Sequence, residues 1–368
     1  MAAAPIMTVG PLAWMRANLF NSITNTIVTL VVLVVFAYAI PGILNWAVFD
    51  AVLTIKPSPD SILGFEFAPS SEACRIATGA CWDFVIEKHR VMVFGLFPHD
   101  QLWRPLLMIV VLLGMVIVSL NTDLWGRTLT IAWVIALPGM FILMQGGLFG
   151  LTFVETSRWG GLPITLILSV NAIVLSFPLA ILLALGRRSD LPIIKTLCVG
   201  FIEAIRGVPL ITLLFMASLM LPLFLPEGTN INKLLRAQIG LILFSAAYVA
   251  EVIRGGLQAI PKGQTEAGEA LGLNYWQNTF FILLPQALKL VIPPTVNTFI
   301  GLFKDTTLII IISMYDFLGA IRLASADPEW RPFYVEGLVL AALVYFIFCF
   351  AMASYARRLE ARLDTSQR

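Results

Sequence analysis

Long runs of apolar residues, separated by short polar segments, dominate the hydrophobic pattern of this chain. An α-helix needs about 20 mostly apolar residues to cross a bilayer. The windows that meet this requirement are 23–48, 104–121, 128–149, 162–186, 202–225, 237–257, 277–300 and 334–355. The pattern therefore predicts an all-α polytopic membrane protein with about eight transmembrane helices.

A further apolar stretch, Leu308–Leu318, is shorter than the others. At about 1.5 Å of rise per residue, a helix of this length cannot cross a hydrocarbon core of ~30 Å. We therefore interpret it as a re-entrant or interfacial segment.

Composition agrees with the apolar pattern. Of the 368 residues, 59% are hydrophobic and 12% are charged, whereas soluble domains average about 45–50% apolar and about 25% charged residues. This disfavours an ordinary soluble enzyme, and a net charge of +2 provides no basic field for nucleic acid.

Motifs for nucleotide binding and catalysis are missing from the sequence. It has no glycine-rich phosphate loop ending in Lys-Ser or Lys-Thr, so we expect no ATP site in this chain. Its two histidines, His89 and His99, lack the spacing of a metal site. We therefore expect no catalytic residues, no bound cofactor and no metal.

Positive charges indicate the orientation. An even number of spans places both termini on one side of the membrane, and cytoplasmic segments carry the excess of Lys and Arg. The tail and the 186–196 loop lie on that same side and contain Arg357, Arg358, Arg362, Arg368, Arg187, Arg188 and Lys195. The pattern predicts a membrane protein with cytoplasmic termini and an outer loop at 50–103, which would be periplasmic in a bacterium.

Two cysteines, Cys74 and Cys81, fall in this outer loop. An oxidising compartment permits a disulfide between them. Two independent thiols are an equally good interpretation of the sequence.

The distribution of motifs divides the chain near residue 155. Residues 1–155 contain three predicted spans and the outer loop. Residues 156–368 contain five predicted spans and nearly all of the sequence signals. We therefore expect an N-terminal extension followed by a core.

The most informative polar stretch, 251–285, lies between two spans on the predicted cytoplasmic side. Pro261 and Gly263 break the preceding helix, and Gly272 is suited to end a short helix after them. Asn274 is suited to begin the next helix. Such a structured loop favours a docking surface over a merely solvated connection.

Several motifs carry a resemblance to a known family. The segment GQTEAGEALG at 263–272, followed by ILLP at 282–285, resembles the "EAA" coupling loop of ABC importer permease subunits. Three further segments resemble motifs of polar amino acid permeases, and they occur in the right order: FIEAIRGVPL at 201–210, YVAEVIRGGLQ at 248–258 and FKDTTL at 303–308.

The N-terminal part points to a subgroup of that family. GACWDF at 79–84, FGLFP at 94–98 and the later MASLMLPLFLPEG at 216–228 are similar to M-type permease subunits of general L-amino acid importers. The resemblance implies a five-helix type I ABC importer core with three extra N-terminal helices.

The resemblance also implies partners and a mechanism. A second, homologous permease subunit would complete the path, two ABC ATPase subunits would use ATP and Mg²⁺, and a periplasmic amino acid-binding protein would deliver the solute. The chain would move L-amino acids into the cytoplasm by alternating access, within the lipid bilayer and without nucleic acid.

The coupling loop, 258–276, would contact the ATPase through its segment 262–274. The residues that match the family motif, or stand in its places, are Gly263, Glu266, Ala267, Gly268, Ala270 and Gly272. Gly268 replaces the family's second alanine, and a glycine inside a helix costs roughly 1 kcal/mol. We therefore expect a slightly looser coupling helix, with Glu266 as its anchor to a basic residue of the ATPase.

Charged residues near the spans have two interpretations. Glu203 and Arg206, and likewise Glu251 and Arg254, lie three residues apart, which favours structural ion pairs on one helix face. Lys304, Asp305 and Thr306 follow a predicted span. They are candidates either for a translocation path that meets a zwitterionic amino acid or for a local hinge.

Two alternative functions stay open at this point. An ion-gradient-driven secondary transporter often has inverted repeats and buried acid or histidine relays, and neither is evident here. A permease for a narrower set of polar solutes is the other alternative.

Overall fold

The computed structural model describes residues 10–57, 65–226 and 231–363. It divides the chain into two compact units, Met1–Glu87 and Lys88–Arg368. Helix α4, Trp82–Phe94, begins in the first unit and ends in the second.

The first unit contains one long apolar helix and a small outer module. Ser22 caps helix α2, Ile23–Leu44, by accepting a hydrogen bond from the backbone of Asn25, and a π-helical turn, η1, continues it over Asn45–Phe49. None of its residues is buried. The other elements of this unit are α1 (Pro11–Asn18), β1 (Ile55–Pro57), β2 (Phe65–Phe67) and α3 (Ser71–Ile76).

The outer module is built around a buried carboxylate. Asp83 is 1% exposed and accepts hydrogen bonds from the backbone and hydroxyl of Thr54 and from the backbone of Ser70. Strands β1 and β2 pair antiparallel, with Ile55 opposite Phe67. This short ribbon is strand structure within a chain that is otherwise mostly helical.

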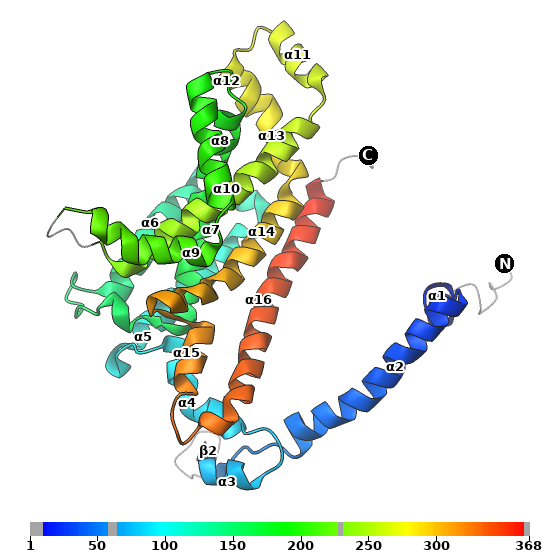
Figure 1. The fold of residues 1–368 in the computed structure, drawn as a ribbon, viewed down its shortest axis with the longest axis vertical. Coiled ribbons are helices and arrows are strands. Elements are labelled where there is room, and N and C mark those ends of the chain that lie inside the picture. Colours follow the sequence, from blue (N-terminus) through cyan, green and yellow to red (C-terminus); the bar gives the residue numbers. More distant parts are fainter. Residues whose placement is uncertain (1–9, 58–64, 227–230, 364–368) are drawn as a thin grey trace. The chain divides into compact units, whose positions relative to one another are not determined.

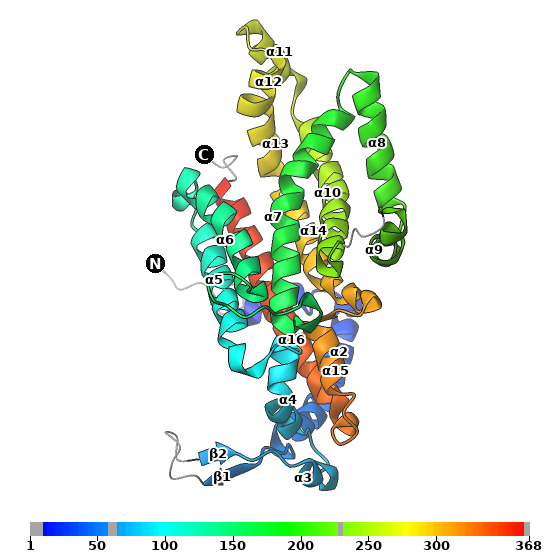
Figure 2. The ribbon, with the colours of Figure 1, turned by 90° about the vertical axis from the view of Figure 1, so that its left-hand side faces the viewer.

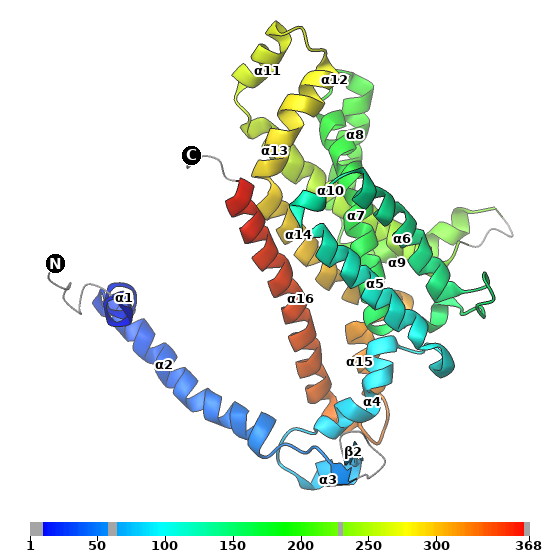
Figure 3. The ribbon, with the colours of Figure 1, turned by 180° about the vertical axis from the view of Figure 1, so that it is seen from behind.

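The second unit consists of helices joined by short connections (Figures 1, 2 and 3). In chain order its helices are η2 (His99–Gln101), α5 (Trp103–Ser119), η3 (Thr122–Leu124), α6 (Arg127–Gln145), η4 (Thr156–Arg158), α7 (Gly161–Arg187), α8 (Pro192–Arg206), α9 (Leu210–Phe215), η5 (Met216–Met220), η6 (Leu221–Phe224), α10 (Lys233–Ala259), α11 (Lys262–Ala270), α12 (Tyr275–Asn278), η7 (Thr279–Leu283), α13 (Leu284–Leu290), α14 (Ile292–Asp305), η8 (Thr306–Ile312), α15 (Phe317–Ala324), η9 (Arg331–Phe333) and α16 (Tyr334–Leu363). A two-residue strand, β3 (Tyr315–Asp316), bridges to Gly160 and Gly161.

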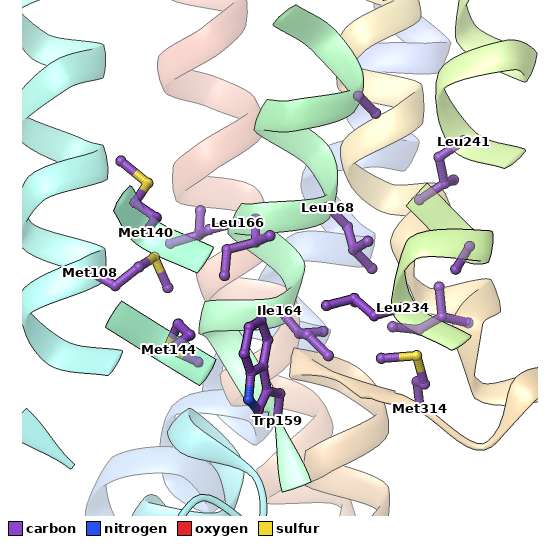
Figure 4. Close-up of a cluster of buried hydrophobic side chains, with 14 of the residues drawn as sticks. Met108, Met140, Met144, Trp159, Ile164, Leu166, Leu168, Leu234, Leu241 and Met314 are labelled. Carbon is purple, nitrogen blue, oxygen red and sulfur yellow. The ribbon is translucent and has the colours of Figure 1, made fainter. Parts of the chain in front are cut away.

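Helix α7 is central to this unit, because it packs along α10 and also contacts α5, α8, α14 and α15. Figure 4 shows Met108, Met140 and Met144 on one side of α7, and Leu234 and Leu241 of α10 on the other. A second core, toward the α11 end, is rich in small residues such as Ala180, Ala246 and Ala250. Small side chains allow helix backbones to approach closely in a membrane protein.

The prediction of about eight spans is confirmed. The described residues contain seven helices of sufficient length and apolar character to span a bilayer, and an eighth candidate formed by a bent pair. Six of the predicted windows match single spans, namely 23–48, 104–121, 128–149, 162–186, 237–257 and 334–355.

The predicted window 202–225 is wrong as a continuous span. Helix α8 ends at Arg206, and the chain turns by 103° before the helical segment Leu210–Phe224. Pro209 lacks a backbone donor and disfavours helical geometry at the residue before it. An average of hydrophobicity over a window does not register such a break.

The predictions for 277–300 and 308–318 are also corrected. The structure places the span at Ile292–Ile312, because Pro293 and Pro294 start a new helix after Val291. The 3₁₀ segment η8 extends that helix, so Leu308–Ile312 is the end of a span. The chain turns away only at Ser313, which has a φ of 57°.

Candidate functional site

The predicted coupling segment forms a helix, a turn and a second helix that project from one end of the second unit (Figures 1 and 2). Helix α11 ends at Ala270, and Gly272 adopts a φ of 75°. The backbone of Gly272 donates to Glu269, and that of Leu273 donates to Gly268. This pair of hydrogen bonds is a Schellman cap, so Gly272 ends the helix as its position in the sequence predicted.

The next helix begins as predicted at Asn274. Its side chain accepts a hydrogen bond from the backbone of Gln277, whose side chain in turn accepts one from the backbone of Asn274. This reciprocal capping box satisfies two donors that a helix start leaves open. The turn between α11 and α12 is therefore defined by local hydrogen bonds at both ends.

Gly268 has a packing role that helix propensity alone did not reveal. A Cβ atom at this position would overlap the side-chain amide of Asn278. Asn278 is 4% exposed and donates to the carbonyl of Thr265 at 3.0 Å. The glycine therefore allows Asn278 to attach α12 to α11, which compensates for its lower helix propensity.

The other predicted coupling residues face outward. Gly263, Glu266, Ala267 and Ala270 are exposed. Within the part of the chain that the structure describes, Glu266 has no hydrogen-bond or ion-pair partner through its side chain. Leu271, at the tip, is 78% exposed. An exposed carboxylate beside an exposed apolar tip is suited to contact another protein.

A cluster of five charged side chains joins α7, α8 and α10. Glu251 is its centre, with a side chain that is 13% exposed. Its carboxylate lies 3.0 Å from Arg254, 3.2 Å from Arg187 and 3.6 Å from Arg206. Arg187 also contacts Glu203, at 2.7 Å.

The structure therefore contains only one of the two ion pairs that were predicted within single helices. Glu251 and Arg254 pair along α10 as expected. Glu203 and Arg206 bind residues of neighbouring helices instead. Arg187 had been counted only as a positive loop charge, because its contacts lie far away in sequence. The cluster holds three helices together, which pairs within one helix could not do.

Lys304 and Asp305 lie in the interior of the span Ile292–Ile312, whereas the sequence analysis placed them after a span. Lys304 is exposed and Asp305 is half-buried. Among the described residues, neither has a hydrogen-bond partner for its side chain or an ion pair outside this dipeptide. Thr306 is buried, and its hydroxyl donates to the carbonyl of Phe303 at 2.9 Å.

This placement has an energetic consequence. Each charge at the centre of a bilayer costs roughly 3 kcal/mol on insertion scales. Charges in a span are usually paired or face a watery cavity. The Thr306 hydroxyl, by contrast, is bonded to the local backbone.

The sequence analysis missed several buried charges, among them Arg104 and Asp316. Arg104 is 1% exposed and donates to the carbonyls of Leu143, Met144 and Thr152, beside the end of α6. Asp316 is fully buried, caps α15, and accepts a hydrogen bond from the hydroxyl of Tyr345 at 2.7 Å. Only the cap had a local signal, an aspartate directly before an apolar run.

In the outer module, Cys74 and Cys81 form a disulfide, so the bonded alternative is the one found. No group of three or more His, Cys, Asp or Glu side chains suited to hold a metal occurs within the described residues.

Comparisons with known proteins agree on one family. Residues 176–365 match the model of the binding-protein-dependent transport system inner membrane component. The chain is 47% identical to the inner membrane amino-acid ABC transporter permease protein YhdY of Escherichia coli K12, over 97% of this chain and 94% of that protein.

Two further relatives differ in how much of the chain they cover. The Rhodobacter capsulatus permease BztC, of a glutamate/glutamine/aspartate/asparagine transport system, is 37% identical over 99% of this chain and 96% of its own length. The probable glutamine ABC transporter permease GlnP of Bacillus subtilis is 34% identical over 55% of this chain and 92% of its own length. A permease can therefore be little larger than the matched part of this chain.

Proposed function

This chain belongs to the family of binding-protein-dependent transport system inner membrane components, and from that premise we propose how it couples ATP use to amino acid import. It is a permease subunit of an amino-acid ABC importer, with the transmembrane helices that such a subunit requires. The comparisons give no support to an ion-gradient-driven transporter. The relatives share amino acids as solutes, so L-amino acids are the proposed substrates.

The single observation that carries the coupling proposal is the α11–α12 unit. It projects beyond the long helices α7 and α10 (Figures 1 and 2). Its turn is fixed by the cap that ends α11 and by the capping box that begins α12, and Glu266 has no side-chain partner of its own among the described residues. A rigid projecting helix transmits motion better than a flexible loop does. In the proposed mechanism, α11 sits on an ATPase subunit and Glu266 binds a basic residue there.

The proposed assembly contains partners that this chain lacks. Two ABC ATPase subunits supply the ATP and Mg²⁺ chemistry, a second homologous permease subunit completes the path, and a periplasmic amino acid-binding protein delivers the solute. The absence of a phosphate-loop motif from the sequence supports this division of labour.

The proposed orientation places both termini in the cytoplasm of a bacterial inner-membrane protein. Arg357 and Arg358 occur near the end of α16, and this end points in the same direction as the α11–α12 unit within the second unit (Figures 1 and 3). The positive-inside rule supports a cytoplasmic location for the end of α16 and for the α11–α12 unit. The outer module and its disulfide then lie in the periplasm, which is an oxidising compartment.

Lys304 and Asp305 are the proposed contact with the transported amino acid. A zwitterion carries a carboxylate and an ammonium, which complement a lysine and an aspartate. Binding of nucleotide by the ATPases would shift the two permease subunits between inward-facing and outward-facing states. Lys304 and Asp305 would then be accessible from the periplasm and from the cytoplasm in turn.

The first experiment is capture of this chain from gently solubilised native membranes, followed by identification of the co-purifying chains by mass. An ABC ATPase and a second permease are the expected partners. A lone chain that still catalyses uptake after reconstitution would overturn the assembly.

The second experiment tests α11 with Glu266→Lys in the reconstituted importer. A charge-assisted hydrogen bond contributes about 1.5–3 kcal/mol, so loss of the contact should lower uptake and solute-stimulated ATP hydrolysis by about tenfold or more. Glu360→Lys makes the same charge change at an exposed position of α16 and should leave both unchanged. Normal transport by Glu266→Lys would refute the coupling role.

A further inference from the structure

The described part of the second unit contains an apolar groove of about 670 Å³. Its walls come mainly from α5, α6, α7, α14 and α16, each of which belongs to a candidate membrane span. They include Val116, Trp133, Val174, Val296 and Met352, and α13 adds Leu288 and Lys289. The groove therefore lies where hydrocarbon, rather than water, is the solvent.

The groove runs along the helices and has two distinct ends. Leu166 of α7 and Phe303 of α14 line one end, and Lys289 and Leu359 line the other. Within α14 alone, from Ile292 to Phe303, the helical rise along the groove is roughly 16 Å, at about 1.5 Å per residue. One leaflet contributes about half of a hydrocarbon core of ~30 Å. The groove is long enough for a lipid chain that reaches from the surface to the middle of the membrane.

Polar groups are few, and two of them lack partners. Lys289 is exposed and, within the described ranges, makes no hydrogen bond or ion pair through its side chain. Thr295 lines the groove, is 6% exposed, and has a hydroxyl without a hydrogen-bond partner. A cation at the mouth and a hydroxyl along the wall are complementary to an anionic headgroup and an ester carbonyl.

Two indole rings complete the wall near Ser119. Trp133 donates to the hydroxyl of Ser119 at 2.9 Å, and Trp125 donates to its carbonyl at 2.9 Å. Both rings line the groove, and their orientation is fixed by these bonds. Tryptophan is enriched at the level of the lipid headgroups. The part of the groove beside Ser119 therefore matches the depth of a headgroup.

We propose that this groove binds one acyl chain of an anionic phospholipid, whose headgroup is held by Lys289. An apolar groove inside the membrane excludes water, and a juxtamembrane lysine contributes about 1 kcal/mol toward an anionic headgroup. The cytoplasmic location of the Lys289 end rests on the orientation in the proposed function; lipid binding itself does not.

The inference gives the extra helices a role. Helices α5 and α6 form one wall of the groove, and both lie outside the matched family segment 176–365. The opposite wall, from α14 and α16, lies within it. A lipid between them would attach the extension to the core while leaving the two free to move relative to each other.

The test measures lipids retained by the purified importer, isolated with its partners, by native mass spectrometry with phosphatidylglycerol and phosphatidylcholine as probes. Val174→Phe fills the groove and should reduce retained lipid by about fivefold or more. Lys289→Gln should keep the acyl chain but reduce the preference for phosphatidylglycerol by about fivefold, the equivalent of ~1 kcal/mol.

Matched controls separate the groove from the general lipid surface. Val134→Phe makes the same change at a position of α6 that is 66% exposed, and Lys195→Gln removes an exposed charge of α8. Both should bind lipid as the wild type does.

Two outcomes would overturn the proposal. One is unchanged lipid retention in Val174→Phe, with assembly intact. The other is an assembly in which the Val296→Cys variant cross-links to the second permease and no lipid is retained. Because retention is measured without transport, failure of the coupling proposal would leave this test unaffected.

Discussion

The charge cluster around Glu251 and the Lys304–Asp305 dipeptide are two solutions to the same problem. Both place ionisable groups in or beside spans. Glu251 is surrounded by three arginines within 3.6 Å, whereas Lys304 and Asp305 have no partners beyond each other among the described residues. The first arrangement satisfies charge locally and stabilises packing. The second leaves charge available, which is what a path for a zwitterion requires.

The two regions should differ most clearly in how the protein responds when one of their charges is removed. A partnered buried charge supports the fold, so its loss is destabilising. An unpartnered charge is a cost to the fold, so its loss leaves stability unchanged or improves it, and the effect appears in transport. Stability and activity should therefore separate between the two regions.

The largest effect is expected from Glu251→Gln. This change leaves Arg187, Arg206 and Arg254 without their common carboxylate. The cluster is only partly buried, so we expect a cost of about 2 kcal/mol, below that of breaking a fully buried pair. We expect a clear fall in the thermal unfolding midpoint of the detergent-purified protein. Glu203→Gln is the control within the same cluster. Its side chain is 54% exposed, so its loss should lower the unfolding midpoint much less than the loss of Glu251 does.

Asp305→Asn should give the opposite pattern. Uptake should fall by about tenfold, because a contact with the ammonium of the solute worth ~1.4 kcal/mol would be lost. The unfolding midpoint should not fall. The amino acid dependence of ATP hydrolysis should also change in the reconstituted importer. A change in the maximum rate alone would favour a local hinge and contradict a contact between Asp305 and the solute.

Within helix α11 the same distinction separates Gly268 from Glu266. Gly268→Ala places a methyl group against the amide of Asn278, and overpacking of this kind costs about 1–3 kcal/mol. We expect weaker coupling, measured as solute-stimulated ATP hydrolysis. Adding Asn278→Ala should restore part of it by creating room.

Gly263→Ala is the matched control for that experiment. A Cβ at Gly263 would meet no atom within 4 Å, and alanine is the better helix former. Coupling should therefore be unchanged or slightly improved. Equal losses in the two glycine variants would show that flexibility, not packing, is what α11 needs.

The smallest effect is expected from a partly exposed ion pair outside the spans. Lys88 contacts Asp327 at 2.7 Å and, together with a backbone hydrogen bond from Glu329, lowers the pKa of Asp327 below its usual value. The resulting stabilisation is fully present above the ordinary aspartate pKa of about 3.9. It is lost as the pH falls through the lower pKa of the folded state.

Asp327→Asn tests this sign. The difference in unfolding midpoint between the variant and the wild type should be small at pH 6, and it should shrink further as the pH falls below the ordinary aspartate pKa of about 3.9. A difference that grows on acidification would contradict the assignment.

The sequence by itself determined the features that depend on neighbours along the chain. Apolar runs define most of the spans because the bilayer requires about 20 such residues in a row. The caps at Gly272 and Asn274 were predictable because their hydrogen bonds connect residues within a few positions. The order of motifs was also sufficient to predict the family, since it needs no knowledge of packing.

Only the tertiary structure decided what distant residues do to one another. Arg187 links Glu203 and Glu251 across three helices, and Gly268 is required by a side chain ten positions away. Because prolines break the helix before Ile292, Lys304 and Asp305 lie in the interior of the observed span. The sequence had placed them after the end of a predicted span. Hydrophobicity is a property of single residues, whereas partnership, close approach and helix direction depend on residues that meet only after folding.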